Sequence, residues 1–492
     1  MFWSRLQLEC LMLFNSYEFI FLFMPATVLG FAILSGRHHG AALLWLTAAS
    51  LFFYCYWEPR SIWILFVSVA ANFGVGWKIS ETKGRASKRY LIIGVTANLL
   101  LLGIFKYTGF IVDAINSVLG PSINRPTIEL PLGISFFTFT QIAYLVDAYR
   151  REVSNHSPLH YSLFVTYFPH LIAGPIIHHK PVMAQLTDPA IARLRAINWV
   201  VGLSFFSIGL AKKLLLADPL GGIVSPLFDA AQASEISPAA SWIATVAYTF
   251  QLYFDFSGYS DMAVGLSLLF GVSIPINFLS PYKAGSIIEF WRTWHISLSA
   301  FLRDYLYISL GGNRHGPFRR YVNLFLTMLL GGLWHGAGWN YIAWGALHGM
   351  YLLINHLWRN VVGMPMGRLL GGVLTFVAVM VGWVFFRAGD ISTALRMLKS
   401  MGSLSQWSTW TWAADPNLAN VSPWFALATV AFATAIVFLA PNSLAITTAL
   451  KGSLEGQGSQ RLAIGVVAAY GLLMGIGIIF LGRVSPFLYF MF

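Results

Sequence analysis

Apolar stretches of about 20 residues recur along almost the whole chain. An α-helix needs about this length to cross the hydrocarbon core of a bilayer. Charged residues make up only 10% of the 492 residues, whereas soluble proteins carry about 25%. The sequence therefore predicts an all-α integral membrane protein. The expected membrane segments lie near residues 17–35, 41–57, 61–78, 91–118, 130–147, 159–178, 197–216, 239–256, 260–276, 321–356, 368–386, 423–440 and 462–482.

No linker rich in Ser, Gly or Pro separates a soluble part from these segments. We therefore expect one polytopic membrane domain over residues 1–492, with a core at 17–390 and C-terminal helices at 391–492. Met12 offers a second start, which would make residues 1–11 an upstream artefact.

Proline and glycine interrupt several apolar segments, as at 131–133, 169–170 and 173–175. Irregular backbone at membrane depth is tolerated only where protein buries it or a cavity hydrates it. The sequence therefore predicts a helical bundle with a cavity. Residues 78–89 carry five Lys or Arg against one Glu, which places this loop and the basic loop 311–320 in the cytoplasm and the N-terminus outside.

A histidine lies inside the apolar run 331–339, Gly-Gly-Leu-Trp-His-Gly-Ala-Gly-Trp. An ionisable side chain at bilayer depth is costly and marks a functional site by default. The imidazole of His335 also suits proton transfer near neutral pH. The flanking glycines permit a helix break or a close approach by a substrate. A histidine that only hydrogen-bonds between packed helices is the alternative.

A second histidine lies in the charged and aromatic segment 289–305. Arg292, His295 and Ser299 follow a spacing of three and then four residues, which predicts that they share one helix face. Such a face would hold the phosphates of a cosubstrate and a second catalytic histidine. An ordinary interfacial helix, with ion pairs such as that of Glu289 and Arg292, explains the pattern equally well.

Two carboxylates, Asp255 and Asp261, lie in an apolar region six residues apart, so they do not share a helix face. Buried carboxylates need partners, and we expect a structural salt bridge to Arg292 or Arg303. His348 follows thirteen residues after the first histidine, so on a continuous helix it would point to nearly the opposite side and serve packing.

Several catalytic and metal-binding motifs are absent. The chain has no HExxH, no Walker A loop and no GxSxG elbow, and none of its 12 histidines precedes an aspartate by five positions. Two cysteines, Cys10 and Cys55, build no zinc cluster. We therefore expect no metal, and any catalysis rests on one or two intramembrane histidines.

Six blocks of this sequence resemble the membrane-bound O-acyltransferase (MBOAT) family, in its bacterial branch typified by the alginate O-acetylation membrane protein. Their order and spacing match over residues 17–390. The resemblance implies about 11–13 membrane segments, including re-entrant helices, around a funnel. It also implies acetyl-CoA as the acyl donor. The blocks are 131–150, 168–176, 251–266, 290–314, 323–349 and 383–388.

The resemblance also assigns roles to residues. His335 matches the family's near-invariant catalytic histidine and would act as general base, or would carry the acyl group covalently. His295 matches a second functional histidine, which would orient the first or stabilise the oxyanion. Four arginines are candidates to bind the phosphates of the coenzyme, because of their charge and their expected cytoplasmic side alone: Arg292, Arg314, Arg319 and Arg320. For Arg314, Arg319 and Arg320 the alternative is that they only follow the positive-inside rule. The residues expected around the catalytic pair are Trp334, Asp304, Asp255 and His348.

The leading hypothesis is a bacterial inner-membrane enzyme that passes an acetyl group across the membrane for O-acetylation of an exported polysaccharide of the alginate, cellulose or peptidoglycan type. A periplasmic or membrane-anchored esterase-like protein would complete the transfer, beside a polysaccharide synthesis and export complex. The alternatives are a D-alanyl or fatty-acyl transferase of the same fold, and a polysaccharide or solute transporter in which His335 relays protons.

Overall fold

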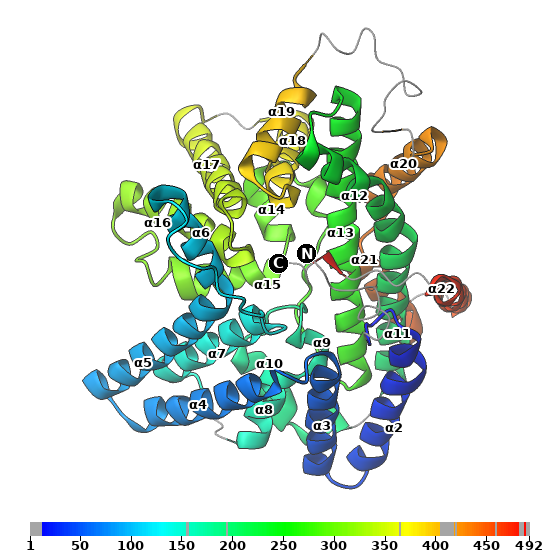
Figure 1. Cartoon of the computed structure of the whole chain (residues 1–492). Helices are drawn as coiled ribbons and strands as arrows, with labels where there is room; N and C mark the ends of the chain where they lie inside the picture. The colour runs from blue at the N-terminus through cyan, green and yellow to red at the C-terminus, as the bar shows by residue number, and fades with distance from the viewer. Residues whose placement is uncertain are drawn as a thin grey trace. The chain divides into compact units, whose positions relative to one another are not determined.

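The computed structural model describes residues 12–153, 157–192, 195–363, 366–403, 418, 421–457, 460–481 and 487–488. Within these ranges every regular element is a helix, which confirms the predicted all-α class (Figure 1). Residues 1–11, suggested above as an upstream artefact, lie outside the described residues.

Long apolar helices alternate along the chain with short helices, and tight turns or breaks separate them. The first half of the chain forms α2 (Met24–Ser35), α3 (His39–Trp57), α4 (Ile62–Glu81), α5 (Gly84–Leu102), α6 (Thr108–Leu119), α7 (Ile134–Tyr149), α8 (Pro158–Thr166), α9 (Phe168–Leu171), α10 (His179–Thr187), α11 (Ala196–Ala211) and α12 (Asp218–Ala233). The second half forms α13 (Pro238–Leu269), α14 (Ile287–Thr293), α15 (Ile296–Phe301), α16 (Gly316–His335), α17 (Trp339–Val361), α18 (Arg368–Arg387), α19 (Ile391–Met401), α20 (Pro423–Leu439), α21 (Ser443–Gly452) and α22 (Gln460–Phe480).

Five helical stretches in the described part of the chain are long and apolar enough to cross a membrane. A sixth is the pair Pro423–Leu439 and Ser443–Gly456, which bends by 54°. The sequence predicts more segments because it also includes short and broken apolar helices, such as Phe19–Ser35. The five stretches are His39–Trp57, Ile62–Glu81, Gly84–Leu119, Ala196–Ala233 and Arg368–Arg387.

Three of the predicted segments are wrong in their continuity. Residues 239–256 and 260–276 were expected as separate segments, but α13 runs unbroken from Pro238 to Leu269. The single segment 321–356 is instead two helices, α16 and α17. The predicted interruptions are confirmed at 173–175, between α9 and α10, and at 131–133, just before α7. The interruption predicted at 169–170 is wrong in place, because these residues lie inside the short α9 and the break between α8 and α9 falls at Tyr167.

The chain clusters into two compact units that interleave along the sequence. Unit 1 comprises residues 1–210, 259–276 and 447–491, and unit 2 comprises 211–258 and 277–446. The single domain over 1–492 stays a prediction. Both predicted catalytic histidines belong to unit 2.

Unit 1 contains a three-helix contact of α4, α5 and α7. Buried amides join these helices: Asn98 donates from Nδ2 to Oδ1 of Asn72 at 2.6 Å, and Gln141 donates from Nε2 to Oγ of Ser68 at 2.8 Å. Such polar pairs satisfy groups that lipid does not hydrogen-bond, and they hold membrane helices together.

Candidate active site

The helix that carries His335 ends at that residue. Gly336 and Gly338 are both extended, with φ of −161° and −165°, so the chain leaves α16 and re-enters a helix at Trp339. A side chain at Gly336 would collide with the ring of Tyr341, which explains why the break uses glycine. The predicted helix break beside His335 is confirmed.

Glycines also allow α16 and α17 to pack closely as a hairpin. An added Cβ at Gly345 of α17 would lie 2.5 Å from the carbonyl oxygen of Met328, and one at Gly332 of α16 would collide with the carbonyl oxygen of Tyr341. Small residues at such crossings let the backbones of membrane helices approach. The hairpin therefore turns the chain back within four residues of His335.

Aromatic rings enclose the His335 side chain, of which 6% is exposed. The imidazole meets the ring of Trp334 at 5.0 Å between centroids, Trp344 of α17 at 5.0 Å and Phe386 of α18 at 5.3 Å, each edge to face. Three consecutive helices, α16, α17 and α18, thus contribute the rings that surround one imidazole. Interactions with charge that develops there are stronger than in water, because the local dielectric is low.

His348 lies near His335 and not on the opposite side as predicted. The prediction assumed one continuous helix, but α17 folds back along α16, so both imidazoles contact the same ring. Trp344 lies 5.0 Å from His335 and 4.8 Å from His348. His348 is fully buried, and neither of its ring nitrogens has a hydrogen-bond partner among the described residues. A Cβ at Gly382 would lie 2.8 Å from its Nε2, so this glycine leaves the space that the imidazole fills.

His295 occupies a break between two short helices. Its backbone is left-handed, with φ 42° and ψ 56°, between α14 and α15. The prediction that Arg292, His295 and Ser299 share one helix face is therefore wrong, because no continuous helix joins them. A left-handed non-glycine residue costs roughly 1–3 kcal/mol, and such residues cluster at functional sites. Asn277 supports the turn by accepting the N–H groups of Ile296 and Ser297, each at 3.1 Å.

The buried His295 imidazole stands edge-on to the ring of Phe256 at 4.7 Å. Its neighbour Trp294 lies 4.9 Å from Trp383, and Trp383 stacks on Trp344 at 5.9 Å with an interplanar angle of 17°. We call Trp294, Trp344, Trp383 and Phe386 the aromatic cluster. This cluster joins the backbone break at His295 to the rings that enclose His335.

Asp255, one of the two predicted buried carboxylates, has a partner other than those expected, and the salt bridge of Asp261 stays a prediction. Lys213 binds Asp255 at 2.7 Å and Asp218 at 2.9 Å, so the salt bridge of Asp255 is confirmed but its predicted arginine partner is wrong. Arg303 instead binds its neighbour Asp304 at 2.7 Å. The signal missed in the sequence was a lysine inside the apolar segment 197–216, which needs an anion as much as the carboxylates need a cation.

The four predicted basic residues lie toward the surface. Arg292, Arg314 and Arg319 are exposed, and Arg320 is half-buried with Nη2 3.5 Å from Nδ1 of His356. In the part of the chain that the structure describes, no ion pair joins Arg292 to Glu289, whose carboxylate accepts the Gly285 N–H at 2.8 Å. Binding of a coenzyme by these arginines stays a prediction.

The chemistry available here is that of imidazoles in an aromatic enclosure. A neutral imidazole accepts a proton from a hydroxyl group, and one that carries a proton donates a hydrogen bond to an oxyanion. No group of three or more His, Cys, Asp or Glu among the described residues is arranged to hold a metal ion. The arrangement suits acid–base or nucleophilic catalysis at His335.

Comparison with known proteins agrees with this chemistry. The model of the membrane-bound O-acyltransferase family matches residues 51–387. A peptidoglycan O-acetyltransferase of Helicobacter pylori is 40% identical and aligns with 98% of each chain. A probable alginate O-acetylase, AlgI, of Pseudomonas aeruginosa is 44% identical over 84% of this chain and 78% of its own. A teichoic acid D-alanyltransferase of Streptococcus thermophilus is 30% identical over 46% of this chain and 57% of its own.

The matched segment runs from α3 to the end of α18 and contains the helix break at His295, the hairpin of α16 and α17, and the aromatic cluster. The Helicobacter pylori relative, 40% identical, aligns with 98% of the chain and therefore extends beyond this segment in both directions. This chain is a multi-pass membrane protein and an O-acyltransferase, a member of the membrane-bound O-acyltransferase family.

Proposed function

We propose that this enzyme transfers an acetyl group from acetyl-CoA toward hydroxyl groups of an exported polysaccharide at the bacterial inner membrane. The observation that carries the proposal is the buried His335 at the glycine break of α16, enclosed by rings from three helices. The relatives named for O-acetylation of peptidoglycan and alginate support acetyl as the cargo, since they match more of this chain than the D-alanyltransferase does.

In the proposed reaction His335 acts as the general base. It takes the proton of the acceptor hydroxyl while the hydroxyl oxygen attacks the thioester carbonyl carbon. The carbon–sulfur bond then breaks, and the thiolate of the coenzyme leaves and takes up the proton. His295 is placed by its left-handed backbone and is proposed to donate a hydrogen bond to the oxyanion. A covalent acetyl-His335 intermediate is the alternative route, and a mass increase of 42 Da on a trapped peptide, roughly the mass that one acetyl group adds, distinguishes it.

The surrounding residues are proposed to hold the two histidines in position. Trp334 and His348 act through the aromatic rings beside His335, whereas Asp255 and Asp304 act through their ion pairs. The arginines Arg292, Arg314, Arg319 and Arg320 are proposed to attract the phosphates of the coenzyme from the cytoplasm, with the N-terminus outside.

The acceptor side is proposed to involve further proteins. A periplasmic or membrane-anchored esterase-like protein would complete transfer to the sugar, beside the machinery that makes and exports the polymer. Peptidoglycan is the first polymer to assay, because the relative named for it matches 98% of this chain.

The test is the acetyl-ester content of peptidoglycan and exopolysaccharide in a deletion strain that carries wild type, His335→Ala or His38→Ala. His38 is an exposed histidine and serves as the matched control. General base catalysis contributes about 10²–10⁴-fold, so His335→Ala should leave only background esters at equal membrane levels. Unchanged acetylation would refute the role of His335. Loss of polymer export would instead favour a transporter, and loss of D-alanyl esters a D-alanyltransferase.

A further inference from the structure

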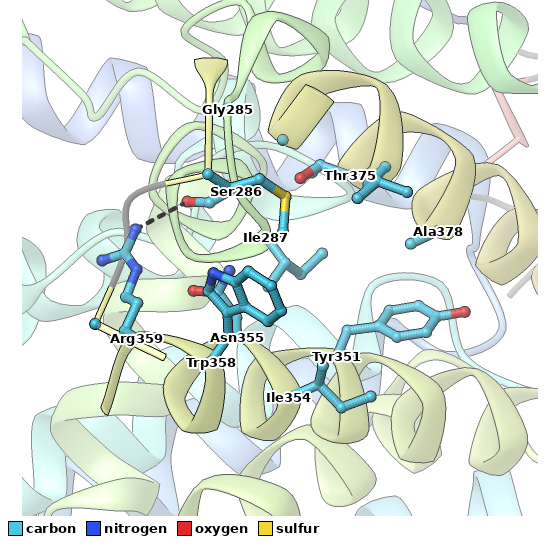
Figure 2. Close-up of a pocket in the computed structure, with 14 residues that line it drawn as sticks. Gly285, Ser286, Ile287, Tyr351, Ile354, Asn355, Trp358, Arg359, Thr375 and Ala378 are labelled. Carbon is cyan, nitrogen blue, oxygen red and sulfur yellow. Dashed lines mark hydrogen bonds between the residues drawn. The ribbon is translucent and has the colours of Figure 1, made fainter. Parts of the chain in front are cut away.

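Unit 2 contains a cavity of about 520 Å³, lined in part by Tyr351, whose ring lies 5.6 Å from that of His348. It lies between α17 and α18 and reaches the segment that precedes α14 (Figure 2). Figure 2 shows Tyr351 and Ile354 on the α17 side and Thr375 and Ala378 on the α18 side. Sites for small ligands have about this size, from roughly 300 to 1,000 Å³.

The body of the cavity is elongated and apolar. Its α17 wall runs from Tyr351 to Arg359, eight positions or about 12 Å along a helix. Ile354 on this wall is 62% exposed, and Leu374 on the α18 wall is 50% exposed. Because α18 is a candidate membrane span, exposed aliphatic side chains along it face lipid chains. The cavity is therefore open to the bilayer along its flank.

One end of the cavity is polar and positively charged. The Arg359 guanidinium donates from Nη2 to Oγ of Ser286 at 3.5 Å, as the dashed line in Figure 2 shows. Arg368 begins α18 close to Gly285, which also lines the cavity. Between the charged end and the apolar body lies Asn355, whose buried Oδ1 has no hydrogen-bond partner among the described residues.

These features specify the chemistry of an occupant. An arginine binds a phosphate through several charge-assisted hydrogen bonds. A buried amide oxygen without a partner costs about 1–3 kcal/mol, and a donor on the occupant would remove that penalty. An apolar groove that opens to lipid suits an acyl chain. Basic pockets between membrane helices bind the head groups of anionic lipids.

We propose that this cavity binds an anionic glycerophospholipid, phosphatidylglycerol, with its phosphate at Arg359, a head-group hydroxyl at Asn355 and an acyl chain along Tyr351 and Ala378. The lipid enters sideways from the bilayer, through the flank at Ile354. Its chain packs on Tyr351, whose ring lies 5.6 Å from the imidazole of His348. A bound lipid thus supports the wall of the enclosure that holds His348. The proposal concerns binding and does not depend on the acyl cargo.

The test is binding of fluorescent phosphatidylglycerol to the purified full chain in a neutral detergent, with unlabelled lipids as competitors. Arg359→Gln removes the phosphate contact, and Arg89→Gln makes the same charge change at an exposed arginine of α5 as the matched control. Ala378→Phe fills the apolar end without changing charge. Size-exclusion profiles identify any variant that fails to fold.

We expect saturable binding that unlabelled phosphatidylglycerol displaces and phosphatidylcholine does not. Arg359→Gln should weaken it roughly tenfold or more, and Arg89→Gln less than about twofold, since a hydrogen bond to a charged group is lost only in the first. Ala378→Phe should weaken binding of long-chain lipid but not of a short-chain analogue. Equal competition by phosphatidylcholine, equal affinity of the two arginine variants, or displacement by coenzyme A alone would each overturn the proposal.

Discussion

The buried cation of unit 2 allows a quantitative test of its packing. Lys213 is 1% exposed and binds two carboxylates, Asp255 at 2.7 Å and Asp218 at 2.9 Å. Replacing it by methionine keeps the length of the side chain but removes the charge. Two anions then remain with no lysine between them, and one of them, Asp255, has a side chain only 3% exposed.

The size of the effect follows from the distances. Coulomb's law at an effective dielectric constant of about 20 gives about 6 kcal/mol for each contact before desolvation is subtracted. Removing one partner of a buried pair measurably destabilises proteins by about 3–5 kcal/mol, because the other charge stays buried. We therefore expect Lys213→Met to lower the free energy of unfolding by about 3–5 kcal/mol.

The matched control is Lys399→Met, the same substitution at an exposed pair. Lys399 lies 3.7 Å from Glu235, and their side chains are 81% and 73% exposed, so its removal should change stability by at most about 1 kcal/mol. Thermal unfolding of the full chain in detergent, followed by intrinsic fluorescence, gives Tm for both variants. The double variant Lys213→Met with Asp255→Asn should recover part of the lost stability.

Equal Tm values for Lys213→Met and Lys399→Met would refute this reasoning, because burial would then add nothing to the pair. Failure of Asp255→Asn to recover stability in the Lys213→Met background would also refute it, since the penalty would not come from the stranded carboxylate.

There are three further predictions: two concern packing around the site, and the third concerns a helix cap. Gly382→Ala places a methyl group 2.8 Å from Nε2 of His348, so acetyl-ester content should fall with at most about 1–3 kcal/mol of lost stability; normal acetylation would contradict the role of this space. Gly345→Val should separate α16 from α17 and lower Tm, whereas an unchanged Tm would mean that the close crossing is dispensable. Asp390 caps α19, and its pKa is lowered chiefly by the hydrogen bond from Ser392. Asp390→Ala should cost about 1 kcal/mol above pH 4, and this difference should vanish as pH falls through the lowered pKa; a difference that persists in acid would contradict the charged cap.

Several parts of the architecture are readable from the sequence because their causes are local. The length of each apolar stretch predicts helices such as α3, α4 and α18, which begin or end within three residues of the expected limits. The glycines after His335 predict the end of α16, since extended glycine does not continue a helix. The isolated imidazole in an apolar run predicts His335 as the centre of the proposed site for the same local reason.

The tertiary structure, in contrast, decided which partners these residues contact. The sequence predicts no contact between His335 and His348, yet the α16–α17 hairpin brings both to Trp344. The partner of Asp255 is 42 residues away in the chain, and no periodicity indicates it. Helix propensity acts over one or two turns, whereas contacts between distant residues depend on how whole helices pack. The sequence therefore determined most of the helices and the helix end at His335, and packing decided which side chains surround this histidine.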